Sequence, residues 1–174
     1  MTTVRRCRDD ELPTIFSLIN AAAEAYRGII PDDCFHEPYM PLSELQAEIA
    51  AGVTFWGYEE NGAPVGIMGI QPVRDVDLIR HAYVLPSHQR RGVGGALLEH
   101  LQHLSRGRML VGTWAAAEWA IDFYRHHGFE EVSSEQKDVL LKTYWTVSDR
   151  QIETSVVLTN LPLDATVVAT DTTR

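Results

Sequence analysis

The segment that decides the fold runs Tyr83-Val84-Leu85-Pro86-Ser87-His88-Gln89-Arg90-Arg91-Gly92-Val93-Gly94-Gly95-Ala96-Leu97-Leu98. It starts as a β-rich strand, passes through a turn rich in glycine and arginine, and continues as an apolar helical pattern. A helix N-terminus offers unpaired backbone N–H groups and the positive end of the helix dipole. Glycines in the turn let an anion approach that backbone closely. The segment therefore predicts a phosphate-binding turn between a strand and a helix.

Two well-known phosphate-binding turns do not fit these residues. A nucleoside-triphosphate P-loop ends in Gly-Lys-Ser/Thr, and the two lysines of the chain, Lys137 and Lys142, lie far from the turn. A dinucleotide fingerprint needs a third glycine three residues after Gly94, where this chain has Leu97. The early strand-helix-strand unit of that fingerprint is also absent. We therefore reject the first turn and disfavour the second.

The turn resembles instead the Q/R-x-x-G-x-G/A signature of the GCN5-related N-acetyltransferase (GNAT) superfamily, which residues 89–94 match. The strand that ends at Val84-Leu85-Pro86 is typical of that superfamily, and residues 120–129 resemble its second recurrent segment. The resemblance implies an α/β (α+β) fold. Its sheet would be mixed and mostly antiparallel, with six or seven strands and helices on both faces.

This resemblance implies that acetyl-coenzyme A (acetyl-CoA) is the donor and that no metal is needed. The backbone N–H groups of residues 90–95 would surround the pyrophosphate, and the strand end at Val84 and Leu85 would separate from its neighbour to receive the pantetheine arm. The donor-binding residues expected are Val84, Leu85, Gln89, Arg90, Arg91, Gly92, Val93, Gly94, Gly95 and Tyr124. The alternative for the two arginines is solvent-exposed charge with no ligand.

Tyr124 is the first candidate for a catalytic residue. In superfamily members with the F-Y-x-x-x-G-F arrangement, this tyrosine lies near the sulfur and protonates the departing thiolate, so the resemblance assigns that role to Tyr124. The alternative is an aromatic packing residue on an apolar helix face. Members often have an asparagine seven residues earlier, where this chain has Ala117, so Glu118 or water would replace one donor contact.

The general base departs from the superfamily pattern as well. An alkylammonium group costs about 4.6 kcal/mol to deprotonate at pH 7, so a nearby group must take the proton. Many relatives carry a glutamate on the strand before the turn, but this chain has Leu78 and Arg80 there. We name His81 as the catalytic candidate, because histidine changes charge near neutral pH. The alternatives are Asp77, Glu24 and Glu37.

Composition limits the class of protein. The chain has 174 residues, 45% of them hydrophobic and 22% charged, which is typical of one globular domain. We predict an N-acetyltransferase domain over residues 1–159 and a poorly ordered tail over residues 160–174. No apolar run is long enough for a membrane helix, and two distant cysteines suit a reducing compartment, so a cytoplasmic protein without a membrane partner is expected.

Charge is distributed unevenly along the chain. The net charge of −9 argues against nucleic acid as a partner. Residues 9–77 contain 13 acidic and two basic residues, for a net −11, whereas residues 78–108 contain five basic and one acidic residue, for a net +4. A basic island in an acidic chain indicates a small polyanionic ligand held at one place. Ordinary surface charge is the alternative.

Hydrophobic periodicity and turn residues predict the order of the elements. Asn61-Gly62 between two β-rich runs indicates a tight hairpin. Strands are expected near residues 2–7, 53–59, 63–71, 76–85, 109–114, 129–131, 139–147 and 153–159, and helices near 12–23, 43–51, 94–105 and 116–127.

The acceptor is the least determined part of the function. Residues 25–39 and the late run 140–145 would line its site, and their acidic and aromatic side chains favour a cationic amine on a small molecule. A plain exposed acidic loop explains the same residues. The rival functions are a non-catalytic acyl-CoA sensor and a transferase of longer acyl groups. The oligomeric state is open, with a homodimer as one candidate.

Overall fold

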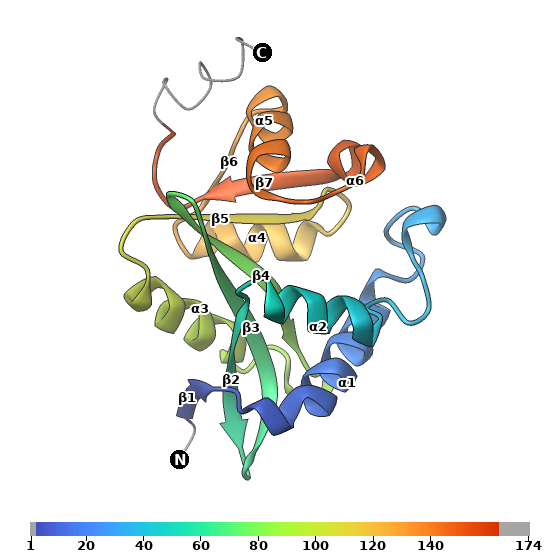
Figure 1. The fold of residues 1–174 in the computed structure, drawn as a ribbon, viewed down its shortest axis with the longest axis vertical. Coiled ribbons are helices and arrows are strands. Elements are labelled where there is room, and N and C mark those ends of the chain that lie inside the picture. The colour runs from blue at the N-terminus through green and yellow to red at the C-terminus, as the bar shows by residue number, and fades with distance from the viewer. Residues whose placement is uncertain (1–2, 164–174) are drawn as a thin grey trace.

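The computed structural model describes residues 3–163, which form one twisted sheet with helices on both faces (Figure 1). Within those residues the sheet has seven strands in the order β1-β2-β3-β4-β5-β7-β6. The strands are β1 (Thr3–Arg6), β2 (Thr54–Glu60), β3 (Ala63–Val73), β4 (Val76–Val84), β5 (Arg108–Trp114), β6 (Glu130–Glu131) and β7 (Ser155–Thr159). Only the β4–β5 pair is parallel. The predicted mixed, mostly antiparallel sheet is confirmed.

Alternating apolar residues explain why helices cover both faces of the sheet. Along β4, Leu78 packs toward one face and Ile79 toward the other, as the two-residue period of a strand requires. One face is covered by α1 (Leu12–Ala22), α2 (Leu42–Ala50), α5 (Ser134–Tyr144) and α6 (Asp149–Thr154). The other face is covered by α3 (Val93–Leu104) and α4 (Glu118–His126).

The predicted hairpin between β2 and β3 is confirmed. Asn61 and Gly62 have φ angles of 55° and 83°, and Glu60 pairs with Ala63 across the turn. These positive φ angles are what a two-residue hairpin loop needs, and asparagine and glycine adopt them at low cost.

The predicted strand at residues 139–147 is wrong, because most of it belongs to helix α5. Its β-rich composition suggested a strand, but Ser133 and Gln136 form a capping box that starts a helix. Buried Leu140 and Leu141 then pack on β5 and β7. The β-rich run at residues 153–159 is likewise a strand only from Ser155 onward, because α6 occupies residues 149–154.

Helix α6 replaces a segment that the sequence suggested was a polar connection. It begins after Ser148, whose side chain and that of Gln151 form a second capping box. The buried Lys137 of α5 donates to the Ile152 carbonyl at 2.7 Å, which ties the two late helices together. The serine and glutamine at this spacing were the sequence signal for both helices.

The end of the predicted domain is only partly described. Asn160 exchanges hydrogen bonds of 2.7 and 3.3 Å with the backbone of Met109, and Arg108 donates to the Pro162 carbonyl at 2.8 Å. These contacts hold residues 160–162 beside β5. Residues 164–174 lie outside the described residues, so the disorder of the tail stays a prediction. Among the described residues, no helix has the length and apolarity that crossing a bilayer requires.

Candidate active site

Strands β4 and β5 separate beside the glycine-rich turn. Their pairing begins at Val76 with Arg108 and ends at Ile79 with Val111. Beyond Ile79, β4 continues to pair with β3, and Leu85 N–H bonds the Val65 carbonyl at 2.9 Å. The edge of β4 that faces β5 has no strand partner from Arg80 to Val84. This gap leaves room for a ligand between the two strands.

The turn itself presents backbone N–H groups at the start of α3. No side chain caps this helix, and the Ala96 N–H bonds the Gly92 carbonyl at 3.0 Å. The N–H groups of residues 93–95 therefore have no acceptor within the helix. Arg90 and Gly92 have φ angles of 63° and 79°, and turns with such residues aim successive N–H groups at one point. Gln89, Arg90 and Arg91 are exposed, so the turn suits a phosphate group.

The predicted donor residues have different structural roles. A Cβ atom at Gly92 would meet no atom within 4 Å, whereas one at Gly94 would lie 3.3 Å from Phe123 of α4 and one at Gly95 would lie 3.0 Å from His127, just after α4. The last two glycines therefore let α3 pack closely on α4. Val93 is buried in the core, so only its backbone faces the turn. Gln89 Nε2 donates to the Val84 carbonyl at 3.3 Å.

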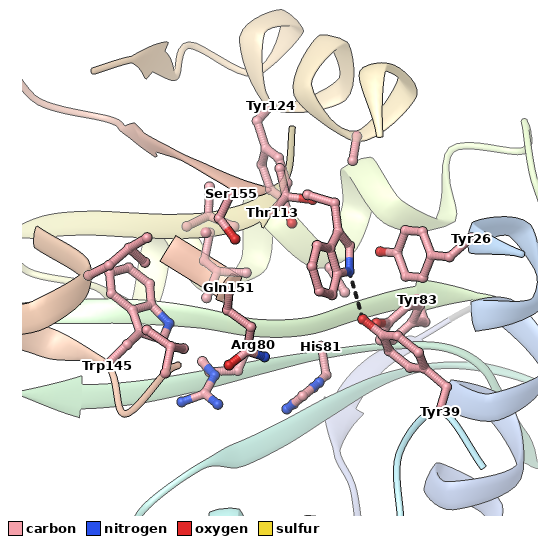
Figure 2. A pocket seen from close by; sticks show the side chains of 18 residues that line it. Tyr26, Tyr39, Arg80, His81, Tyr83, Thr113, Tyr124, Trp145, Gln151 and Ser155 are labelled. Carbon is pink, nitrogen blue, oxygen red and sulfur yellow. Dashed lines mark hydrogen bonds between the residues drawn. The ribbon is translucent and has the colours of Figure 1, made fainter. Parts of the chain in front are cut away.

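A cavity of about 180 Å³ lies where β4 and β5 separate (Figure 2). Its lining joins the two strands to α4, to α5 and α6 with the residues next to them, and to two tyrosines between α1 and α2. The lining residues are Tyr26, Tyr39, Ile79, Arg80, His81, Ala82, Tyr83, Val111, Gly112, Thr113, Trp114, Ala120, Tyr124, Leu141, Trp145, Val147, Gln151 and Ser155. The two predicted catalytic residues lie on opposite sides of this cavity in Figure 2.

Tyr124 lines the cavity from α4. Its ring packs edge-on against Phe123 and Phe129, with ring centres 5.1 and 5.7 Å away. Burial raises the pKa of the Tyr124 hydroxyl above its ordinary value. The hydroxyl therefore stays protonated at neutral pH and is available as a hydrogen-bond and proton donor.

Of the four base candidates, His81 alone lines the cavity. Asp77 accepts a hydrogen bond from Ser105 at 2.6 Å, near the start of β4. Glu24 and Glu37 are exposed, and both pair with Arg27. Ala117, at the position of the missing asparagine, is fully buried and caps α4 through its backbone.

Sequence reasoning missed Glu48, which contacts His81 from α2. Its Oε2 atom lies against His81 Nε2, and its Oε1 atom accepts from Arg80 Nη2 at 2.7 Å. Burial opposes the charge on this carboxylate, but the hydrogen bond from His81 and the charges of His81 and Arg80 hold its pKa below the ordinary value. No sequence motif connects the two residues, because they are 33 positions apart.

Aromatic side chains form the wall opposite the late helices. Trp114 Nε1 donates to the Tyr39 hydroxyl at 2.8 Å, and the Tyr26 ring lies 5.4 Å from that of Tyr39 and 5.9 Å from that of Trp119. Burial raises the pKa values of Tyr26, Tyr39 and Tyr83. These hydroxyls remain neutral, and the wall offers ring faces and neutral polar groups to a ligand.

Two contacts hold the segment between α1 and α2, which carries Tyr39. The Asn20 side chain bonds both the N–H and the carbonyl of Met40, at 2.9 and 3.0 Å. Arg150 at the start of α6 bonds both carboxylate oxygens of Asp33, at 2.9 and 3.2 Å. Of the segment from Ala25 to Tyr39, only Tyr26 and Tyr39 line the cavity, and the ion pair ties this segment to α6, whose Gln151 lines it too.

Comparison with known proteins agrees with this geometry. Residues 51–131 match the acetyltransferase (GNAT) domain family. Over 151 residues the chain is 24% identical to the peptidyl-lysine N-acetyltransferase YiaC of Escherichia coli (strain K12), covering 87% of this chain and 99% of that protein.

Solved structures share the fold over most of the chain. The PaiA N-acetyltransferase of Thermoplasma acidophilum in complex with coenzyme A aligns with a TM-score of 0.71 at 13% identity, over 93% of this chain and 99% of that one. A GNAT-family acetyltransferase of Staphylococcus aureus aligns with a TM-score of 0.69 at 14% identity, over 91% and 98% of the two chains. The domain match over residues 51–131, the separated strands and these likenesses agree with one another: the chain has the fold of the GNAT acetyltransferases and is similar to them in sequence.

Proposed function

We propose that the chain transfers an acetyl group from acetyl-CoA to the primary amine of a small molecule, in one direct step. The observation that carries the proposal is the placement of Tyr124 and His81 on opposite sides of one cavity, beside the gap between β4 and β5. A proton acceptor and a proton donor are what transfer from a thioester to an amine needs. No covalent enzyme intermediate is required.

The donor side relies on backbone groups and on Tyr124. The N–H groups at the start of α3 and the nearby arginines would hold the pyrophosphate. The free edge of β4 would hold the thioester oxygen as negative charge develops on it. Tyr124 would then give its proton to the departing sulfur, for which its neutral hydroxyl is suited.

The acceptor side relies on His81 and on the aromatic wall. His81 would accept the proton that the amine loses as it attacks the thioester. The cavity of about 180 Å³ and its aromatic wall suit an alkylamine group. The Arg150–Asp33 pair would hold the bordering segments together around it.

Peptidyl lysine is the second candidate acceptor, because the similar YiaC carries that activity in its name. A lysine side chain could enter the same cavity with its peptide outside. Two further alternatives are a longer acyl group on the donor and an acyl-CoA sensor without turnover. Each makes a different prediction for a single panel of donors and acceptors.

The test follows thiol release from acetyl-, propionyl- and succinyl-CoA with small amines and with lysine peptides. We expect release with acetyl-CoA and at least one small amine, with kcat/KM higher than for any peptide. Preference for peptides would reassign the acceptor, and preference for another donor would reassign the acyl group. Donor binding by calorimetry without release from any pair would favour the sensor.

A further inference from the structure

We propose that Glu48 is a positioning residue that fixes the tautomer of His81, so that His81 Nδ1 takes the proton of the acceptor amine. This inference rests on the function proposed above. It adds to the site a residue of α2, a helix that does not line the cavity.

The β-bulge in β4 makes the contact possible. Neighbouring residues of a regular strand point to opposite faces, yet Arg80 and His81 both contact the Glu48 carboxylate. The register of β3 and β4 shifts at this point, so that His81 and Ala82 together lie opposite Met68. His81 has a φ angle of 54°, which is costly for a residue other than glycine. The bulge turns two consecutive side chains toward one acidic group.

Hydrogen bonds hold the Glu48 carboxylate in one orientation. Arg80, which bonds its Oε1 atom, also donates from Nη1 to Gln71 Oε1 at 2.9 Å. Gln71 Nε2 in turn donates to the Ala51 carbonyl, just after α2, at 3.1 Å. The side chains of Glu48, Arg80 and His81 are 16%, 19% and 12% exposed, so water competes weakly for these bonds.

The charge of Glu48 determines which nitrogen of His81 carries a proton. Its lowered pKa keeps the carboxylate ionised at neutral pH, where it can only accept hydrogen bonds. The nitrogen against it, Nε2, must therefore donate, so that in the form of the ring with one proton the lone pair lies on Nδ1. Arg80 is the other charged group at this carboxylate. Tyr83, Tyr26 and Tyr39 also face the site, and burial keeps these hydroxyls neutral.

Aromatic neighbours restrict the ring further. The His81 ring stacks with Phe55 and Tyr83, with ring centres 6.1 and 6.4 Å away. As the amine nitrogen bonds the acyl carbon and the sulfur leaves, the amine proton would pass to Nδ1. The resulting imidazolium keeps its Nε2–H bond to Glu48, so the new positive charge forms beside a negative one.

The experiment compares Glu48→Gln with Glu44→Gln, which removes the same charge from an exposed position one turn earlier on α2. Nitrogen-15 NMR of the His81 ring reports the tautomer, with signals assigned by their loss in His81→Gln. We expect the Nε2–H form in the wild type and in Glu44→Gln, and a mixture in Glu48→Gln. We expect kcat to fall about 10- to 100-fold in Glu48→Gln alone, with coenzyme A affinity and acceptor KM nearly unchanged.

Glu48→Gln leaves Arg80 without its partner and can lower stability. The double variant Arg80→Gln/Glu48→Gln removes both charges and repeats the test without a lone buried cation. A wild-type Nδ1–H tautomer, or full kcat in a folded Glu48 variant, would overturn the proposal. A wild type that transfers nothing would instead overturn the proposed function, and the ring spectra would still decide whether Glu48 fixes His81.

Discussion

The donor turn and the acceptor cavity are built in different ways. The donor turn comes from one continuous segment, and backbone N–H groups with positive φ angles at Arg90 and Gly92 define it. The cavity is shaped by side chains from distant segments: Trp114 and Tyr39, 75 residues apart, line it, and the Arg150–Asp33 pair, 117 apart, joins two segments beside it. Backbone geometry would therefore hold the donor, whereas side-chain pairing over long distances would shape the acceptor site.

The largest effect is expected from Gly92→Glu, which changes the donor turn. The new carboxylate would stand at the helix start where phosphate is expected, so we predict a loss of coenzyme A affinity of about 100-fold or more in calorimetry. Gly62→Glu is the matched control, since Gly62 also has a positive φ and open space around its Cα. It carries the same backbone strain away from the turn. If the two variants bound coenzyme A with equal affinity, the turn would have no role in donor binding.

The second-largest effect is expected on the rate of acetyl transfer and not on donor binding. Tyr124→Phe removes the hydroxyl that is proposed to protonate the sulfur, so we expect kcat to fall about 100-fold with the coenzyme A Kd within about twofold of wild type. Tyr144→Phe is the control, because it removes a hydroxyl that bonds Asp75 at 2.7 Å and does not line the cavity. A Tyr124→Phe enzyme with wild-type kcat would leave this tyrosine only a packing role.

A third prediction concerns pH and the acidic group on the acceptor side. Folding lowers the pKa of Glu48 below its value in the unfolded chain, about 4.3. The ionised carboxylate therefore stabilises the fold above that pH, and this stabilisation disappears as the pH falls through the lower pKa of the folded state. We expect the free energy of unfolding at pH 7, measured with urea, to be about 1 to 3 kcal/mol larger for the wild type than for Glu48→Gln. The difference should shrink below about pH 4; a constant difference down to pH 2 would contradict the assignment.

The smallest effect should come from the ion pair between the two acceptor segments. Asp33→Asn breaks the bidentate contact with Arg150 in an exposed setting, so the free energy of unfolding should stay close to that of the wild type. Acceptor KM should rise about twofold to threefold, since the walls are less well joined, while donor affinity stays constant. Glu153→Gln removes the other partner of Arg150 and serves as the comparison. A larger effect on donor affinity than on acceptor KM would contradict this picture.

The contrast also explains what the sequence could predict. The strand, turn and helix around Gly92 are local features, and the structure has each of them at the expected residues. Glu48 could not be found this way, because its contact depends on the bulge at His81 and on the packing of α2 against the sheet. Because side chains of a regular strand alternate, the sequence predicts Arg80 and His81 on opposite faces of the sheet and gives no sign that both contact Glu48.

The errors near the C-terminus have a different cause. Valine, tyrosine and tryptophan in residues 139–147 are typical of strands, but the packing of Leu140 and Leu141 under a capped first turn outweighs that preference. The serine and glutamine pairs before α5 and α6 would have predicted both helices. Roles of the individual site residues stay predictions until the variants are measured.

The Asn20 side chain has a further consequence for how such a protein diversifies. Asn20 of α1 hydrogen-bonds both the N–H and the carbonyl of Met40, as a neighbouring strand would, and so holds the end of the α1–α2 connection against α1. Exposed residues between Arg27 and Pro38 other than Asp33 can then change while Tyr39 and the start of α2 keep their places, whereas the buried Ile30 cannot. We therefore expect new acceptors to be accommodated by changes in this connection, without rebuilding the donor turn.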